Sequence, residues 1–275
     1  MMGRVGGKGS GADRRHRVVV ALAAALCAPA ATRAAHPLAT DDAGTLGRGV
    51  RQAELTGQMS RDTEGRGAAR TSDDTGEGGV AVGYGLRDDL DLVLGVATSW
   101  SRVHQQGGPT SETRGLGDVA VDVKWRALEA GGFALALKPG ITLPTGDADQ
   151  GLGTGRPCYA LTLVASQELG PVGLHANVAY LRDDYGRRED REVSRLDRLR
   201  FSVALAAQVA EKLQLVADVG AETNTDRASP TWPAYALGGA IFAASDDVEL
   251  DLGVRVGLSA PEADLAGLLG ATFRF

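Results

Sequence analysis

The sequence has little cysteine, few aromatic residues and no long hydrophobic run beyond its first 35 residues. Without a run of about eighteen apolar residues, any membrane span must be built from β-strands. Of the two cysteines, Cys27 lies in a segment that we expect to be removed. Cys158 then has no intramolecular disulfide partner, so we interpret it as a small buried residue and expect no metal site.

Residues 1–35 resemble an export signal peptide. A basic stretch at 14–17 precedes the apolar or small run VVVALAAALCAPAA at 18–31, which is too short to cross a membrane as a helix. Small residues near Ala35 suit cleavage, so we expect the mature chain to begin near His36. Leucine precedes Cys27, where a lipoprotein signal has glycine or alanine, so we do not expect lipidation.

The charge balance argues against a nucleic-acid partner. Removing residues 1–35 takes away six of the 29 Lys and Arg and one of the 35 Asp and Glu, which leaves a formal net charge of −11. The composition points to no cofactor. The remaining residues suffice for one domain, which we divide into a periplasmic leader at 36–47 and a barrel at 48–275.

From residue 48 onward the apolar residues alternate with a period of two. In the segment 117–127, Val119, Val121 and Val123 share one face, whereas Asp118, Asp122, Lys124 and Arg126 share the other. A strand with one aliphatic and one charged face cannot be buried on both sides. Twelve such segments are predicted, most of about ten residues, the length that a tilted strand needs to cross a bilayer. The predicted strands are 49–59, 77–86, 90–101, 117–127, 133–143, 158–167, 172–181, 198–209, 213–222, 234–243, 248–259 and 265–275.

The links between these segments favour a membrane barrel over a soluble β-sandwich. Short links at 87–89, 128–132, 168–171, 210–212 and 245–247 alternate with longer or more polar ones at 60–76, 102–116, 144–157, 182–197, 223–233 and 260–264. Outer-membrane barrels alternate in this way, with short periplasmic turns and long outer loops. We therefore predict an all-β, transmembrane antiparallel up-and-down β-barrel of about twelve strands in the bacterial outer membrane.

The few aromatic residues fall near the predicted strand ends, where their rings can lie at the lipid headgroups. The final segment, LAGLLGATFRF, closes on Phe275 and resembles the terminal signal that barrel proteins present to the barrel-assembly machinery. We expect the assembly machinery, outer-membrane lipid and lipopolysaccharide as partners. The predicted aromatic girdle consists of Tyr84, Trp100, Trp125, Phe133, Tyr159, Tyr180, Phe201, Tyr235, Phe273 and Phe275.

Several stretches carry a family resemblance: HPLATDDAGTLGRG at 36–49, GYGLRDDLDLVLGV at 83–96, GLGDVAVDVKWR at 115–126, LALKPGITLPTGD at 135–147, GLGTGR at 151–156, EKLQLVADVG at 211–220 and the closing TFRF. The chain resembles the outer-membrane transporters assigned to the MetA pathway of phenol degradation. The resemblance implies a barrel with a transport role and no established substrate. The leader HPLATDD suits either a plug or lid folded into the barrel or a disordered segment.

If the aliphatic face meets lipid, the opposite face lines the lumen and carries charges of both signs. Unpaired charges are costly at barrel depth, so these groups must face water or one another. The candidate lumen-lining residues are Glu54, Asp91, Asp118, Asp122, Lys124, Arg126, Lys138, His175, Asn177, Arg198, Arg200, Asp218, Glu222, Glu249, Asp251, Arg255 and Arg274.

Several functions are compatible with this lumen. Opposed charges across a water-filled constriction would pass small polar or amphipathic solutes, whereas charges paired across a narrow lumen would close it. The transported solutes that we expect include aromatic or hydrophobic compounds. Ser166, His175 and Asn177 have the residue types of a hydrolase set, although polar residues are expected at every inward position. The loop 182–197 could bind lipopolysaccharide phosphates or divalent cations, or be merely solvated. We favour a channel or transporter without enzymatic activity.

Overall fold

The computed structural model describes residues 36–64, 71–105 and 110–275, so the expected export signal at 1–35 lies outside the described residues. No helix among these residues is long and apolar enough to cross a membrane. The strands are β1 (Arg51–Glu64), β2 (Thr71–Arg87), β3 (Leu90–Gln105), β4 (Thr110–Ala130), β5 (Phe133–Leu143), β6 (Cys158–Leu169), β7 (Val172–Arg182), β8 (Asp197–Ala210), β9 (Leu213–Glu222), β10 (Ala234–Ala243), β11 (Val248–Gly257) and β12 (Leu265–Arg274).

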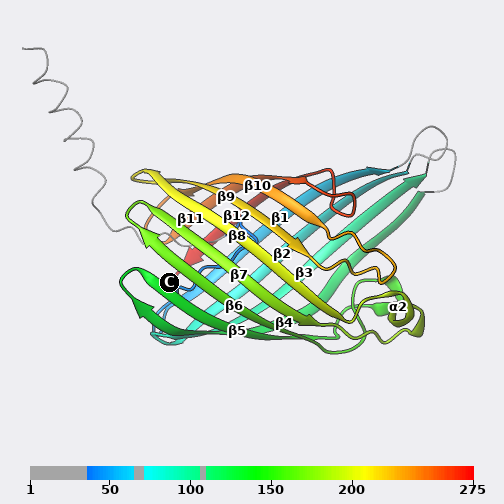
Figure 1. Ribbon diagram of the computed structural model, residues 1–275, viewed down its shortest axis with the longest axis horizontal. Coiled ribbons are helices and arrows are strands. Elements are labelled where there is room, and N and C mark those ends of the chain that lie inside the picture. Colours follow the sequence, from blue (N-terminus) through cyan, green and yellow to red (C-terminus); the bar gives the residue numbers. More distant parts are fainter. Residues whose placement is uncertain (1–35, 65–70, 106–109) are drawn as a thin grey trace, which may run out of the picture.

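The twelve strands close into one antiparallel barrel, in which each strand pairs with its neighbours in sequence and β12 returns to β1 (Figure 1). Leu55 lies opposite Ala271 in the closing register. The N–H of Phe275 donates to the carbonyl of Arg51 at 3.0 Å and so extends this pairing to the last residue. The predicted all-β up-and-down barrel is confirmed, with the predicted number of strands.

The strands carry their large apolar side chains outward and their polar or small ones inward. In β8, Leu199, Val203 and Leu205 are 41–45% exposed, whereas Ser202 is 6% and Ala204 is 1% exposed. A protein in water shows the reverse pattern. The outward surface therefore needs apolar surroundings, as the predicted strand alternation requires.

Short turns lie at one end of the barrel and the longer loops at the other. Gly131 and Gly132 make the β4–β5 turn with φ of 60° and 82°, conformations that residues with a side chain rarely adopt. The C-terminal end lies with the short turns, and the loop that contains α2 (Arg188–Val193) lies at the opposite end (Figure 1). The loop between β5 and β6 holds the 3-10 helix η2 (Ala148–Gln150).

The first four strands extend further toward the loop end than the sequence pattern predicted. Residues 60–64, 71–76, 102–105 and 110–116 were assigned to loops, but they continue the strands. These segments lack an apolar face and pair instead through outward charges, with Arg61 bonded to Asp74 at 2.7 Å and Arg102 bonded to Glu112 at 2.7 Å. A pattern that relies on hydrophobic alternation cannot detect such strands.

Nine of the ten predicted girdle residues point outward, and the prediction for Tyr235 was wrong. Tyr235 faces the lumen, because the odd-numbered positions of β10 face inward, as the 5% exposure of Leu237 shows. The Tyr235 hydroxyl donates to Asp218 at 3.3 Å, and the Arg255 guanidinium lies 5.1 Å from its ring centroid. Both faces of β10 are small or apolar, so alternation alone did not identify the outward one. The nine exposed members are Tyr84, Trp100, Trp125, Phe133, Tyr159, Tyr180, Phe201, Phe273 and Phe275.

Candidate functional site

The leader, residues 36–47, lies inside the barrel and contacts the inward side chains of many strands. At its start, His36 Nδ1 lies 2.5 Å from the carboxylate of Asp251 on β11. The next residue, Pro37, is fully buried, and a Cβ added at Gly239 or Gly253 would lie 2.8 Å from its ring. Inward glycines on two adjacent strands therefore make the space that the leader enters.

The middle of the leader is held by one carboxylate of β9. Asp218 is 1% exposed and accepts hydrogen bonds from the backbone N–H groups of Ala39 and Thr40, both at 2.8 Å, and from the Thr40 hydroxyl at 2.9 Å. Leu38 packs against two of the small apolar clusters of the lumen wall. Because a carboxylate accepts charge-assisted bonds strongly, Asp218 fixes the leader backbone as well as one side chain.

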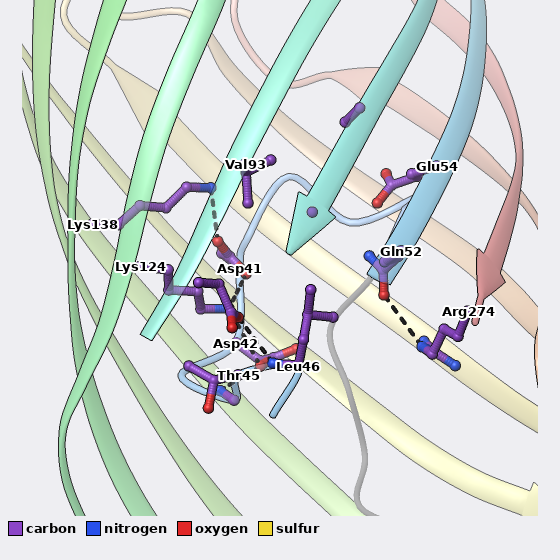
Figure 2. Close-up of a pocket in the computed structure, with 14 residues that line it drawn as sticks. Asp41, Asp42, Thr45, Leu46, Gln52, Glu54, Val93, Lys124, Lys138 and Arg274 are labelled. Carbon is purple, nitrogen blue, oxygen red and sulfur yellow. Dashed lines mark hydrogen bonds and ion pairs between the residues drawn. The ribbon is translucent and has the colours of Figure 1, made fainter. Parts of the chain in front are cut away.

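A carboxylate of the leader bridges two cations of the barrel wall. Asp41 accepts from the ammonium groups of Lys124 on β4 and Lys138 on β5, each at 2.9 Å (Figure 2). Asp42 lies 3.6 Å from Lys124. In the orientation that gives both the oxygen and the nitrogen of its amide a partner, Asn177 accepts from the backbone N–H of Asp41 at 2.7 Å and donates to the Asp41 carbonyl at 3.0 Å.

The ionisation of Asp41 depends on these two lysines. Burial opposes the charged form, but the ammonium groups of Lys124 and Lys138 outweigh burial and hold the pKa of this leader carboxyl well below its usual range. Asp41 is therefore charged at neutral pH. The leader is thus docked by ion pairs as well as by hydrogen bonds.

Ser166 and His175 lie directly opposite each other on β6 and β7, with Ser166 Oγ 2.8 Å from His175 Nδ1. The leader covers this pair, since the N–H of Ala43 donates to Ser166 Oγ at 2.8 Å. Ser166 is 6% exposed and His175 is 0% exposed. Asn177, the third residue of the expected hydrolase set, contacts Asp41 instead of His175. The pair anchors the leader, and no substrate can reach it in this arrangement.

A cavity of about 160 Å³ remains between the leader and the wall formed by β12 and β1 to β5. Figure 2 shows Glu54, Val93 and Arg274 around this space, with Leu46 reaching into it from the leader. The N–H of Leu46 donates to Asp91 at 2.9 Å, and the second oxygen of Asp91 has no partner among the described residues. For comparison, a cavity of about 150 Å³ can hold one benzene molecule.

The predicted lumen residues separate into groups along the barrel. At the short-turn end, Arg274 bonds Glu249 at 2.7 Å, and Arg126 pairs with Glu129 at 3.2 Å. Glu54 and Asp122 have no hydrogen bond or ion pair with other described residues. In contact with the leader, directly or through Ser166, are Asp91, Lys124, Lys138, His175, Asn177, Asp218 and Asp251.

The remaining five predicted residues surround the loop end. Arg198 bonds Asp183 at 2.6 Å and Glu222 at 3.2 Å, and Glu222 also accepts from Arg200 at 2.6 Å. Asp118 accepts from the N–H groups of Gly146 and Thr154, both at 2.8 Å, and Arg255 pairs with Glu262 at 2.8 Å. The arginines here are paired with carboxylates, Asp118 is satisfied by neutral donors of the β5–β6 loop, and several of these bonds hold the loops to the barrel mouth.

The charged loop 182–197 is largely paired within itself. Arg188 bonds Glu192 at 2.7 Å across one turn of α2, Arg187 bonds Glu189 at 3.1 Å, and Arg191 bonds Asp184. The guanidinium of Arg191 holds the pKa of Asp184 below its usual range. No group of three or more His, Cys, Asp and Glu that could hold a metal ion occurs within residues 36–64, 71–105 and 110–275.

Sequence reasoning missed the anchoring role of several residues. Ser166 was considered only as a hydrolase candidate, and the glycines that face Pro37 were not singled out. Inward glycines in the middle of a strand indicate the close approach of another backbone, so Gly239 and Gly253 indicated in the sequence that a second segment packs there. The alternation of apolar and polar residues could not show that the segment approaching these glycines is the leader.

A family model described as "Putative MetA-pathway of phenol degradation" matches residues 55–275. The chain belongs to this family. Among solved structures, this family member resembles the COG4313 outer membrane channel from Pseudomonas putida F1, with 18% identity, a TM-score of 0.62, and 85% of this chain and 98% of that one covered. It matches none of the curated proteins.

Two further solved structures share the barrel fold of this family member. The translocator domain of the autotransporter NalP from Neisseria meningitidis has 14% identity and a TM-score of 0.52, with 96% of each chain covered. The NanC porin has 10% identity and a TM-score of 0.53, with 80% of this chain and 98% of that one covered.

Proposed function

We propose that the chain is an outer-membrane channel for small solutes whose lumen is constricted by its own leader. The observation that carries this proposal is the leader docked on inward charged groups, with a cavity of about 160 Å³ beside it. A wall that is aliphatic outside and charged inside suits a channel in lipid. The fold that this chain shares with the COG4313 outer membrane channel supports this proposal.

The size and lining of the cavity limit the solutes that we propose. About 160 Å³ accommodates a molecule with one small ring, and the lining combines Val93 and Leu46 with the polar groups of Gln52 and Glu54. A small amphipathic or aromatic compound matches this mixture better than a large sugar. Larger solutes require the leader to move.

We also infer the route by which the chain reaches the membrane. Residues 1–35 act as a cleaved signal peptide, and the C-terminal strand is presented to the barrel-assembly machinery. Phe275, exposed at 68% and paired with Arg51 at the closing seam, is available at the strand end that such machinery would contact. N-terminal sequencing of protein from outer membranes tests the cleavage: a first residue at 35, 36 or 37 is expected, and an uncleaved chain contradicts it.

Planar bilayer recording of refolded protein tests the channel. We expect small, stable conductance steps from wild-type protein that migrates as a folded, heat-modifiable band. Deletion of residues 36–46 should increase the conductance several-fold, because the deletion removes the groups that bind Asp218, Lys124 and Lys138. Folded protein without conductance in either form would overturn the proposal.

A closed structural barrel is the second candidate, and the leader contacts favour it. If wild-type protein is silent and only the deletion variant conducts, the barrel is closed at rest and opens by leader movement. Hydrolysis is not part of our proposal, because Ser166 is 6% exposed and already accepts the N–H of Ala43. A serine hydrolase activity that Ser166→Ala abolishes without unfolding would contradict this.

A further inference from the structure

A groove of about 780 Å³ runs over the wall across β1 to β4, β11 and β12. Its floor consists of outward-facing glycines: Gly57 lies opposite Gly78, and Gly267 lies opposite Met59. Most other strands carry Leu, Val or aromatic side chains at many of their outward positions. The missing side chains leave a hollow in a wall that otherwise presents aliphatic groups to the lipid.

Apolar side chains border this hollow. Met59, Leu252 and Leu269 are 65%, 63% and 67% exposed, because the neighbouring glycines leave their flanks uncovered. At the loop end, the indole of Trp100 lies over Gly76, where an added Cβ would collide with it. A hollow with these walls can hold a flexible hydrocarbon chain by close van der Waals packing, which is what favours contact between apolar surfaces inside a membrane.

The loop end of the groove is basic. Arg114 lines the groove and lies opposite Trp100 in the β3–β4 register. No carboxylate pairs with its guanidinium among the described residues. Beyond it, Arg61 and Arg102 are exposed at the outward surface, although each is already bonded to a carboxylate. Arginine beside an aromatic ring at the membrane boundary is well suited to bind a phosphate.

We propose that this groove is a lipopolysaccharide site, with one acyl chain of lipid A lying over the glycines and a lipid A phosphate bound by Arg114. The inference rests on the outer-membrane location within our proposed function. The basic end lies with the long loops and therefore at the outer leaflet, where lipid A is the phosphorylated lipid. The basic end of the groove therefore lies where the lipid A phosphate would be, and the apolar part lies where the acyl chain would be.

Two outward glycines supply a matched pair of variants. A Cβ added at Gly267 or at Gly238 meets nothing within 4 Å, so a larger side chain is tolerated at either position. Only Gly267 lines the groove. Gly267→Leu therefore fills the groove, and Gly238→Leu adds the same side chain to the wall outside it. Arg114→Gln removes the cation, and Arg182→Gln, on the exposed outer part of β7, is its control.

The experiment uses refolded, detergent-solubilised protein with Trp125→Phe and Trp232→Phe, so that Trp100 is the only indole. Purified lipid A is titrated while Trp100 fluorescence is recorded. We expect saturable binding that Gly267→Leu and Arg114→Gln each weaken at least tenfold, with Gly238→Leu and Arg182→Gln within twofold of the parent. Heat-modifiable migration verifies that each variant is folded.

Three results would overturn the inference. The first is equal lipid A affinity for Gly267→Leu and the parent. The second is equally tight binding of phosphatidylglycerol with brominated chains, measured by quenching, which would make the groove a general acyl-chain site. The third is a dimer in the parent that Gly267→Leu dissociates, which would assign the groove to a second copy. All three readouts are independent of conductance, so a silent bilayer recording would affect only the proposed function.

Discussion

Asp41 of the leader and Lys124 of β4 form an ion pair at 2.9 Å inside the barrel. The same carboxylate also reaches Lys138 of the neighbouring strand β5 at 2.9 Å. One side chain of the leader thus joins two strands of the wall. Removing it leaves two cations without their shared partner, whereas removing either lysine leaves Asp41 with the other.

We therefore expect Asp41→Asn to loosen the leader more than any other single change of a leader side chain. With Asp41 26% and Lys138 27% exposed, solvent screens the pairs, and we expect a loss of about 1–3 kcal/mol of docking free energy. That loss raises the population with a displaced leader by roughly fivefold to 150-fold. Conductance in planar bilayers should rise, and a cysteine introduced at Ala39 in a Cys158→Ala background should react faster with a maleimide.

Glu192→Gln is the control for this variant, because it removes an exposed ion pair with Arg188 in α2, outside the lumen. Its conductance and labelling rate should match those of the parent. Equal labelling of Ala39→Cys in the presence and absence of Asp41 would show that the ion pairs do not hold the leader.

Acidification should leave the Asp41 contacts intact over a wide range. The lysines lower the pKa of Asp41 in the folded protein below its value in the unfolded chain, which is about 3.9. The stabilisation is therefore fully present above about pH 4 and is lost only as the pH falls through the lower folded-state value. We expect the labelling rate of Ala39→Cys, corrected for thiol reactivity, to stay constant between pH 7.5 and 5. A rise at pH 5 that Asp41→Asn abolishes would contradict this assignment.

The space around Pro37 gives a steric test of leader docking. A Cβ at Gly253 would lie 2.8 Å from the Pro37 ring, and its other neighbours are at ordinary distances. Gly253→Ala should therefore displace the leader from this point and raise the conductance, while the strand pairing of β11 stays intact. Gly238→Ala, on the outward face of β10, meets nothing within 4 Å and should behave as wild type. Equal conductance of the two variants would mean that Pro37 does not restrict the lumen.

Much of the fold follows from alternation, because each strand meets lipid on one face and the lumen on the other. Strands β5, β9 and β10 begin and end at the predicted residues. Alternation fails where its physical cause disappears. In the extensions of β1 to β4 the outward face carries charged side chains, and cross-strand pairs such as Arg102 with Glu112 replace the apolar face. In β10 both faces are small or apolar, so the orientation of Tyr235 could not be deduced.

The candidate site was less accessible from the sequence. Inward charges such as Lys124 and Asp218 follow from their strand positions, and HPLATDD suggested a plug as one of two alternatives. The pairing of leader and wall depends on a segment without periodicity, docked against strands up to 215 residues away in the case of His36 and Asp251. No local pattern encodes such distant partners. Only the inward glycines opposite Pro37 gave a local indication.

Charge in the lumen leads to an expectation for ion selectivity. The wall carries eight predicted inward carboxylates against seven Lys and Arg, and the docked leader adds Asp41 and Asp42, so ten carboxylates face seven cationic groups. Because the local potential raises the concentration of counter-ions, the channel should prefer cations modestly. In a tenfold KCl gradient the reversal potential should have the sign of potassium permeation. Deleting residues 36–46 removes both leader carboxylates and should move the reversal potential toward zero; an anion-selective wild-type channel would exclude this account of the lumen.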